Sequence, residues 1–369
     1  MHDPYKALYI HVPFCKQRCR YCDFATQAVD PSSPLICEYV DHVILEIRRA
    51  GKQGLLSQVE TVYLGGGTPS YIGLGALTEI MYILGLSMHL TDQVECTMEA
   101  NPDSLTERMV NDLWALGVNR LSIGVQSFDD SVLRTLGRVH DAQAAQRAVE
   151  IAHGRFQNVS VDLMCGIPGQ SAESFRQSLR AAIDLGVTHV SVYPLAIEPG
   201  TPFDELVSRG AMPEPDDDVE AEHMRIAAQE LSQAGFERYE VANYAKPGFQ
   251  SRHNTAYWTG KPYLGIGPSA ATMTQNAQRR MRKQDDAITD DLDARQMRVE
   301  DVMLGMRMSQ GVSEETLSRA CELAPELREV MDSLVDRGLV RHEAGRWMPT
   351  ESGWLCGNEL YGAIFDVAP

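Results

Sequence analysis

The stretch Tyr9-Ile-His-Val-Pro-Phe-Cys15-Lys-Gln-Arg-Cys19-Arg-Tyr-Cys22-Asp-Phe24 places three cysteines in a C-x3-C-x2-C spacing directly after a short apolar run. Thiolate sulfur is the soft ligand that iron–sulfur clusters and zinc select. A four-iron cluster normally takes four cysteines. Three cysteines in one loop therefore predict a cluster with one iron open to an exchangeable ligand, and an open coordination position is where chemistry or ligand binding takes place.

A structural zinc site is the minor alternative for this loop. Such a site needs a second ligand pair at Cys-x2-4-Cys or His-x3-5-His spacing, and the sequence contains none. A disulfide framework does not suit a chain of 369 residues that shows no secretory signal. The other cysteines stand in apolar-rich segments and are predicted to be small buried residues: Cys37, Cys96, Cys165, Cys321 and Cys356.

The bulk composition narrows the class of protein. The length of 369 residues favours two domains. The formal net charge of −18 argues against a nucleic-acid partner, because phosphate binding relies on clustered Lys and Arg. No uninterrupted apolar stretch approaches the ~20 residues of a membrane-spanning helix, so we expect no transmembrane segment. Free cysteines in such a chain predict a reducing cytoplasmic location, which also suits an oxygen-sensitive cluster.

Short β-branched runs alternate with amphipathic stretches from Ala7 to about Tyr193, and this alternation predicts βα units and a parallel sheet. Six units are present instead of the eight of a closed barrel. We therefore expect an α/β fold built on a partial, open (β/α)6 TIM-like barrel. The predicted strands are Ala7–Val12, Val59–Leu64, Val94–Met98, Val118–Val125, Val159–Met164 and Val187–Tyr193. The predicted helices include Ile36–Ala50, Ser104–Leu116 and Ser171–Leu185, the last with Ser171 as its N-cap.

Three domains are predicted along the chain. Residues 1–235 form the barrel-like core, and 236–293 form an aromatic-rich segment and linker. Residues 294–369 form a small C-terminal α+β domain that resembles a winged helix, with helices at Ser313–Ala320 and Pro325–Arg337 and a ribbon at Gly338–Pro349. Because the chain is acidic, this domain is expected to pack or bind a partner and not to read DNA.

Polar or glycine-rich motifs follow five predicted strands in succession. They are the cysteine loop, Gly65–Ser70, Glu99-Ala-Asn-Pro, Gln126-Ser-Phe and Gly166–Gln170. The ends of parallel strands meet at one edge of a barrel, where the active sites of this architecture lie. One such loop alone would be an ordinary turn, but five in succession predict a binding site.

The cysteine spacing beside an aromatic residue resembles the radical S-adenosylmethionine (SAM) enzymes, and Tyr9–Cys15 is similar to their coproporphyrinogen-oxidase-like branch. The resemblance implies that Cys15, Cys19 and Cys22 hold a [4Fe-4S] cluster, and that SAM chelates the fourth iron through its amino and carboxylate groups. It further implies that the glycine-rich turn binds the SAM amino group. Carboxylate and amide acceptors would take the ribose hydroxyls, and a guanidinium would grip a carboxylate in a bidentate manner. Motif by motif, the matching positions are Tyr9, Gly66, Gly67, Thr68, Glu99, Gln126, Arg138 and Asp162.

The motif His253-Asn-Thr-Ala-Tyr257-Trp258 lies in the aromatic-rich segment. A histidine beside flat rings indicates a heme site, because imidazole is a common axial ligand of heme iron. Without further support, a hydrogen-bonded histidine in a packed loop would be the ordinary interpretation. The motif, however, is similar to the H-N-x-x-Y-W motif of the HemW-like heme chaperones within the same branch, and this implies that His253 is a heme ligand.

Two further features separate the branches. Oxygen-independent coproporphyrinogen dehydrogenases carry a fourth cysteine two residues after the third, where Phe24 stands here, and a longer N-terminal extension. Both departures favour the HemW-like family. One departure points the other way: Ala271 occupies a position that is commonly His in that family, so a second polar contact to heme is missing.

The expected function is therefore that of a heme chaperone, which binds heme, a [4Fe-4S] cluster and SAM and transfers heme to acceptor hemoproteins. The resemblance implies respiratory acceptors at the membrane surface and a homodimer formed on heme binding. It leaves open whether SAM is cleaved. The first alternative is a radical SAM enzyme that decarboxylates coproporphyrinogen III, and the second is a radical SAM enzyme acting on an unrelated substrate.

Overall fold

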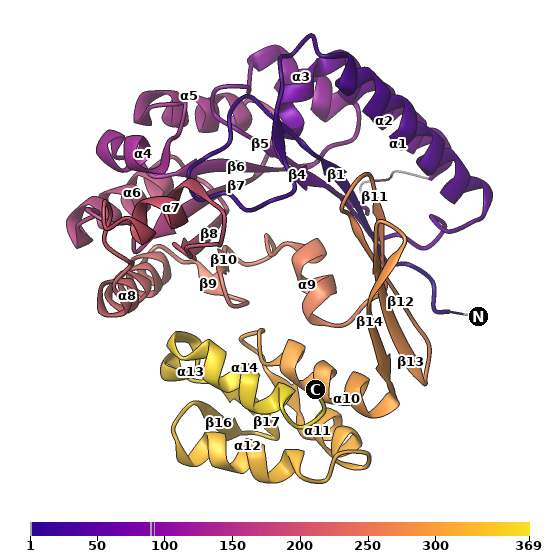
Figure 1. Ribbon diagram of the computed structural model, residues 1–369, viewed down its shortest axis with the longest axis vertical. Coiled ribbons are helices and arrows are strands. Elements are labelled where there is room, and N and C mark those ends of the chain that lie inside the picture. The colour runs from indigo at the N-terminus through magenta and orange to yellow at the C-terminus, as the bar shows by residue number, and fades with distance from the viewer. Residues whose placement is uncertain (1, 89–90, 92) are drawn as a thin grey trace.

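The computed structural model describes residues 2–88, 91 and 93–369. Six parallel strands form the middle of one large sheet, as the alternating pattern predicts: β1 (Ala7–Val12), β4 (Thr61–Gly66), β5 (Glu95–Ala100), β6 (Arg120–Gln126), β7 (Asn158–Cys165) and β8 (His189–Pro194). The sheet is open, because β1 pairs with β11 on its outer side and β8 pairs with β10, so β1 and β8 do not meet. In Figure 1 the strands form an arc with a convex and a concave side.

The two faces of the arc differ in chemistry because side chains alternate along each strand. The convex face carries Val, Leu and Ile side chains such as Val62, Leu64 and Ile123, which belong to the main hydrophobic core. The concave face carries polar side chains at the intervening positions, among them Thr61 and Glu99. Burial of the apolar face stabilises the sheet, whereas the polar side chains of the concave face are available to form a binding site.

Amphipathic helices cover the convex face (Figure 1). Most of them start at a Ser, Thr or Asp whose side chain accepts a hydrogen bond from the first turn, and the predicted N-cap Ser171 is confirmed. Their bounds are α1 (Pro34–Lys52), α2 (Gly73–Ser87), α3 (Glu107–Ala115), α4 (Asp130–Leu136), α5 (Ala142–His153) and α6 (Ala172–Asp184). The turn η1 (Pro69–Ile72) precedes α2, while α7 (Pro202–Ser208) and α8 (Asp217–Gln233) follow β8.

Residues 236–293 contribute strands to both edges of the sheet and the helix α9 (Arg252–Trp258) between them. At one edge lie β10 (Asn243–Ala245) and β9 (Glu237–Arg238). At the other edge β11 (Tyr263–Ile266) runs parallel to β1, and antiparallel strands β12 (Ala271–Gln275), β13 (Arg279–Gln284) and β14 (Ala287–Asp293) continue the sheet outward. The charged residues that suggested a linker pair across strands instead, as Arg282 does with Asp290.

The helix α9 (Arg252–Trp258) carries the H-N-x-x-Y-W motif and lies on the concave side of the arc (Figure 1). Ser251 caps it by accepting a hydrogen bond from the Asn254 amide at 3.2 Å. The Glu95 carboxylate, at the start of β5, accepts hydrogen bonds from the Arg252 and His253 amides at 2.8 and 3.0 Å. An acidic group at a helix N-terminus is stabilised by the helix dipole, so these contacts anchor α9 against the sheet.

The C-terminal domain has its own hydrophobic core, built around Trp347, Leu317 and Leu334. The predicted order of helix, helix and ribbon is confirmed. The elements are α10 (Ala294–Gly305), β15 (Val312–Ser313), α11 (Glu314–Cys321), α12 (Leu327–Asp336), β16 (Val340–Glu343), β17 (Arg346–Pro349), α13 (Glu351–Leu355) and α14 (Gly357–Phe365). Arg280 on β13 is buried and forms ion pairs with Glu300 and Asp301 on α10, which join the domain to the sheet.

Two smaller expectations need correction. Cys96 and Cys165 are buried as predicted, but Cys37 and Cys356 are exposed, because they lie on the outer faces of their helical segments. The stretch Pro69–Ser87, formed by η1 and α2, is long and apolar enough by composition to cross a membrane, against expectation. Residues such as Leu77 and Ile80 bury one face of α2 in the main core, and a core helix meets the same criterion.

Candidate functional site

A cavity of about 330 Å³ lies at the carboxyl ends of the parallel strands. Volumes of this order hold small-molecule ligands. Ten of the twelve residues predicted to bind cofactors line it, although they come from five different strand ends. They are Cys15, Cys19, Cys22, Gly66, Gly67, Thr68, Glu99, Gln126, Arg138 and Asp162.

The three cysteines surround the outer part of this cavity. Cys15 ends the short strand β2 (Phe14–Cys15), which pairs with β3 (Gln27–Ala28) and fixes the loop between them. Among the described residues, no three His, Cys, Asp or Glu side chains already surround a single ion position. A [4Fe-4S] cluster would bind each of the three thiolates at a different iron.

Hydrogen-bond donors reach two of the cysteine sulfurs. The Thr68 hydroxyl donates to Cys15 Sγ at 3.5 Å, and the Arg138 guanidinium donates to Cys19 Sγ at 3.1 Å. Burial raises the pKa of the Cys15 and Cys22 thiols. Donors to cluster sulfurs tune the reduction potential of iron–sulfur centres, so the residues present fit a cluster that these cysteines would hold.

The glycine-rich turn leaves no room for side chains. Gly66 has φ +109°, which favours glycine, and a Cβ there would lie 2.4 Å from the His11 ring. A Cβ at Gly67 would lie 2.6 Å from the Phe14 carbonyl oxygen. The chain therefore passes close to the cysteine loop and presents its backbone to the cavity, which is the arrangement in which backbone amides approach a ligand.

Glu99 lies in the cavity beside the glycine turn. Its carboxylate accepts hydrogen bonds from the Tyr63 hydroxyl at 2.7 Å and from the Gly66 amide at 3.0 Å. Burial raises the pKa of Glu99 to about 7, although both hydrogen bonds act in the opposite direction. Each carboxylate oxygen can accept a second hydrogen bond, so Glu99 retains capacity for a cationic ligand group beside the glycine turn.

Arg138 is fixed at the opposite wall. It donates hydrogen bonds to the Asn101 side-chain oxygen and to the Gly124 carbonyl, both at 2.7 Å. Its buried Nε has no hydrogen-bond partner among the described residues. Buried donors are nearly always satisfied, so this free N–H points to an acceptor supplied by a ligand, and a carboxylate is the matching chemistry.

Gln126 and Asp162 complete the inner wall. Gln126 adopts φ +66° beside a register shift in the β6–β7 pairing. Strained backbone of this kind in a non-glycine residue gathers at ligand-binding sites. Burial raises the pKa of the Asp162 carboxyl, which accepts a hydrogen bond from the Ser122 hydroxyl at 3.3 Å. The two residues supply an amide and a carboxyl group to the same wall.

Tyr9 and His253 are the two predicted site residues that do not line this cavity. The Tyr9 hydroxyl shares a hydrogen bond of 3.0 Å with His11 Nδ1, so Tyr9 supports the residue on which Gly66 packs. His253 is 2% exposed, and burial lowers its pKa to about 3.

Both ring nitrogens of His253 are engaged. Nδ1 shares a hydrogen bond of 2.9 Å with the Thr61 hydroxyl, and Nε2 shares one of 3.1 Å with the Tyr257 hydroxyl. Its ring also stacks on Tyr63, with centroids 5.0 Å apart. Coordination of heme iron by His253 would require one of these bonds to open, and this role stays a prediction.

Three residues of the site escape the sequence analysis. Tyr63 lies inside a strand and shows its role only through its contacts with Glu99 and His253. Asn101 accepts a hydrogen bond from Arg138 and donates one to the Thr68 hydroxyl at 3.1 Å. It belongs to the Glu99-Ala-Asn motif, so the motif could have identified it. Arg120 is buried at the start of β6, where its charge opposes the effect of burial that raises the pKa of Glu99 and Asp162, and no local pattern marks it.

Two family profiles match the chain. That of the radical SAM superfamily covers residues 9–182, and that of the HemN C-terminal domain covers residues 292–356. The heme chaperone HemW of Bacillus subtilis is 33% identical over 97% of this chain and 99% of that protein. The chain belongs to the HemW family. The HemW protein of Escherichia coli is 40% identical over 72% of this chain and 70% of that protein.

A solved structure confirms the fold. The coproporphyrinogen III oxidase HemN of Escherichia coli, a radical SAM enzyme, superimposes with a TM-score of 0.81 over 98% of this chain and 90% of that one. Its sequence identity is 21%, so this likeness concerns the fold alone. The match to the radical SAM superfamily spans the cysteine loop, the glycine turn and the other strand-end motifs that line the cavity.

Proposed function

We propose that this protein is a heme chaperone, which binds a [4Fe-4S] cluster, SAM and heme and transfers heme to acceptor hemoproteins. The observation that carries the proposal is the match to a heme chaperone over nearly the whole of both chains. The cavity adds physical support, because cluster ligands and a set of polar groups suited to SAM line one space.

The cofactor-binding roles follow from the chemistry of each wall. Cys15, Cys19 and Cys22 hold the cluster, which supplies one iron for the amino and carboxylate groups of SAM. Glu99 and the turn Gly66–Thr68 would bind the SAM amino group, because a carboxylate and backbone carbonyl groups accept hydrogen bonds from the N–H donors of an amine. Arg138 binds the carboxylate through its unpaired Nε. The ribose hydroxyls bind to acceptors on the inner wall, for which Gln126 and Asp162 are the candidates.

Phe24 favours the chaperone over the coproporphyrinogen dehydrogenase. It lines the mouth of the cavity and is 61% exposed. An exposed phenylalanine offers an apolar surface and no thiol at the position where the dehydrogenases carry their fourth cysteine. The residue thus suits contact with an apolar ligand or partner and not the chemistry of an additional cysteine.

Heme binding involves α9, with His253 as the predicted iron ligand. We place the protein in the cytoplasm, with respiratory hemoproteins at the membrane surface as its acceptors and a homodimer as its heme-bound state. These three statements rest on the family resemblance.

The first test is a heme titration of the anaerobically reconstituted protein beside His253→Ala and Tyr257→Phe. Saturable binding in the wild type, with a Soret band that survives gel filtration, is expected. His253→Ala should weaken binding, whereas Tyr257→Phe should not, because it only frees Nε2 of the histidine. Undiminished binding by His253→Ala would move the ligand elsewhere, and no binding by the wild type would overturn the chaperone proposal.

A second test addresses the enzyme alternative. The reconstituted protein is incubated anaerobically with SAM, a reductant and coproporphyrinogen III, and the products are separated by chromatography. The chaperone proposal predicts no protoporphyrinogen IX. Its formation at a catalytic rate would contradict the proposal and support the dehydrogenase.

A further inference from the structure

The helix α9 lies between the concave side of the sheet and the C-terminal domain (Figure 1). Its first half contacts the sheet, because His253 bonds to Thr61 and stacks on Tyr63. Its last residue, Trp258, contacts Arg307 in the turn that follows α10 of the C-terminal domain. The helix that carries the predicted heme ligand is therefore held from two sides by parts of the chain that are far apart in sequence.

Arg307 is half-buried and covers the ring of Trp258. Its guanidinium carbon lies 5.1 Å from the centre of that ring and 4.3 Å from the centre of the Tyr361 ring on α14. A guanidinium within about 6 Å of an aromatic ring is attracted to the electron density of the ring face. Arg307 therefore joins α9 to the C-terminal domain through two cation–π contacts.

Backbone hydrogen bonds attach the same turn to the segment beside α9. The Ser309 amide donates to the Tyr239 carbonyl oxygen at 3.0 Å, and Met308 forms an antiparallel bridge with Glu240. The Tyr239 hydroxyl in turn accepts a hydrogen bond from the amide of Ser251, the N-cap of α9, at 3.2 Å. The turn after α10 thus supports α9 at both of its ends.

This arrangement keeps the predicted heme ligand closed. His253 is 2% exposed, and both of its ring nitrogens share hydrogen bonds. Coordination of heme iron needs a free ring nitrogen and room for a flat macrocycle beside it. His253 therefore cannot reach iron while α9 stays in this position, and the structure is a closed state with respect to heme coordination.

Resting on the proposed heme chaperone function, we propose that the C-terminal domain is an autoinhibitory clasp on α9, with Arg307 as the residue that closes it. Release of Arg307 from Trp258 lets α9 leave the sheet and frees a ring nitrogen of His253 for iron. A ligand binds more weakly when only a fraction of the molecules is in the competent state, and loss of the clasp raises that fraction. The clasp therefore lowers the affinity of the resting protein for heme.

The test is a heme titration of the anaerobically reconstituted full-length protein, wild type beside Arg307→Ala, followed by Soret absorbance. Arg307→Lys keeps a cation near both rings and is the conservative variant. Arg155→Ala is the matched control, because the Arg155 guanidinium lies 5.5 Å from the ring of Trp114, a tryptophan on α3 that is 53% exposed. Hydrogen exchange of the heme-free proteins then compares the amides of α9 with those of β6.

Arg307→Ala should lower the Kd for heme about three- to tenfold, the range that corresponds to cation–π contacts at partly buried sites. Damage to the fold would weaken binding, so a gain in affinity separates the clasp from a general structural role. The α9 amides should exchange faster in this variant, whereas those of β6 should not change. Arg307→Lys should stay within about twofold of the wild type, and Arg155→Ala should match the wild type in both measurements.

Three results would overturn the clasp. Arg307→Ala could bind heme as tightly as the wild type or more weakly, or Arg155→Ala could show the same gain in affinity. Tighter binding by Arg307→Ala without faster exchange in α9 would also contradict the clasp, because the gain would not come from opening. In each case the wild type still binds heme, so the chaperone function survives. No heme binding by the wild type would instead remove the function on which the clasp depends.

Discussion

Glu99 is half-buried and lies between the glycine turn and the concave face of the sheet. Burial raises its pKa to about 7 because the charged form loses contact with water, and the Tyr63 and Gly66 donors only partly offset this. Perturbed carboxyl groups in a cavity are characteristic of functional sites. A bound ligand can thus change the protonation state of Glu99.

The first prediction concerns SAM affinity. Glu99→Gln should raise the Kd for SAM about 10- to 100-fold, because a hydrogen bond to a charged group is replaced by a neutral one. Isothermal titration calorimetry on the reconstituted protein measures the change. Glu198→Gln, at another carboxyl group that lines the cavity, is the control and should leave the Kd within a few-fold. Equal effects of both substitutions would contradict a specific role of Glu99.

The second prediction is a pH dependence of stability in the protein without cofactors. The pKa of Glu99 is about 7 in the folded state and 4.5 ordinarily. Between these values the folded state therefore binds more protons than the unfolded state, so the free energy of unfolding falls as pH rises. Between pH 4.5 and pH 8, the free energy of unfolding of the wild type should fall by up to about 3 kcal/mol more than that of Glu99→Gln. Urea unfolding of both proteins measures it, and parallel pH profiles would refute it.

At the scale of one element, α9 connects three regions of the molecule. His253 stacks on Tyr63 beneath the cysteine cavity, and the Trp258 indole N–H donates to Glu240 at 2.8 Å. Glu240 is buried, and burial raises its pKa to about 6. The indole N–H therefore supplies one of the hydrogen bonds that offset the loss of water around the buried Glu240 carboxyl group.

The third prediction follows from that hydrogen bond. Trp258→Phe keeps most of the apolar volume but removes the donor to Glu240, and should lower the free energy of unfolding by about 1–3 kcal/mol. The cost should shrink in the double variant with Glu240→Gln, which has no charge to compensate. Trp114→Phe, at a tryptophan that is 53% exposed, should cost less than about 0.5 kcal/mol. Urea unfolding distinguishes these cases, and equal costs at the two tryptophans would contradict the argument.

The elements differ in how far the sequence predicts them. Local periodicity and capping predict β1 and the helices of the core. The cofactor motifs lie in loops that follow parallel strands, and the parallel sheet places these loops together at one edge. The place of α9 follows no local pattern, because its contact between His253 and Thr61 joins residues 192 positions apart. The pairing of β11 with β1 is likewise a long-range contact. The sequence therefore predicts the cysteine cavity but not its connection to the H-N-x-x-Y-W helix.

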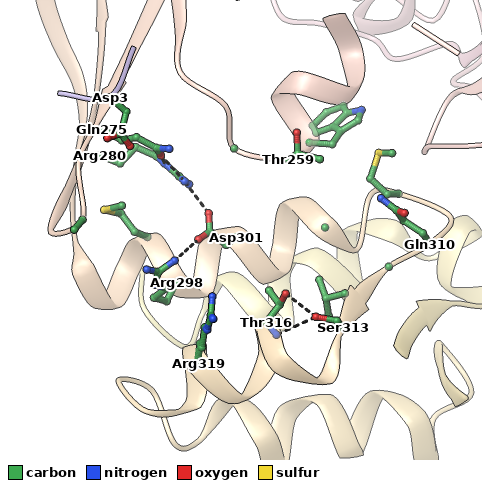
Figure 2. Close-up of a pocket in the computed structure, with 18 of the residues that line it drawn as sticks. Asp3, Thr259, Gln275, Arg280, Arg298, Asp301, Gln310, Ser313, Thr316 and Arg319 are labelled. Carbon is green, nitrogen blue, oxygen red and sulfur yellow. Dashed lines mark hydrogen bonds and ion pairs between the residues drawn. The ribbon is translucent and has the colours of Figure 1, made fainter. Parts of the chain in front are cut away.

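At the scale of the whole molecule, the C-terminal domain is held to the sheet by a buried charge. Arg280 is 2% exposed and binds Glu300, Asp301 and the Gln275 side chain. Glu300 also pairs with Arg282 at 2.8 Å and Asp301 with Arg298 at 3.2 Å. Loss of Arg280 would therefore remove part of the compensation of both carboxylates, together with the hydrogen bonds that join the domain to the sheet. Arg280 and Asp301 also line a cavity of about 720 Å³ between the sheet and the C-terminal domain (Figure 2).

The fourth prediction compares two adjacent arginines. Arg280→Ala should lower the free energy of unfolding by about 2–3 kcal/mol, the scale of hydrogen bonds to charged groups, and should expose the junction between the sheet and α10 to limited proteolysis. Arg279→Ala removes a pair with Asp291 in which the arginine side chain is 60% exposed, and should cost at most about 1 kcal/mol. Urea unfolding and protease digestion measure both effects. Equal stability of the two variants would show that the buried network does not join the domains.

The outermost strand of the sheet, β14, has a consequence for the behaviour of the protein at high concentration. An uncovered strand offers free backbone groups to a second chain and invites edge-to-edge aggregation. On β14 the exposed side chains include Asp290, Asp291 and Asp293. Two such edges repel each other while these carboxylates are ionised. The carboxylates on β14 therefore protect the protein from edge-to-edge aggregation at neutral pH. This protection is lost once acid protonates them.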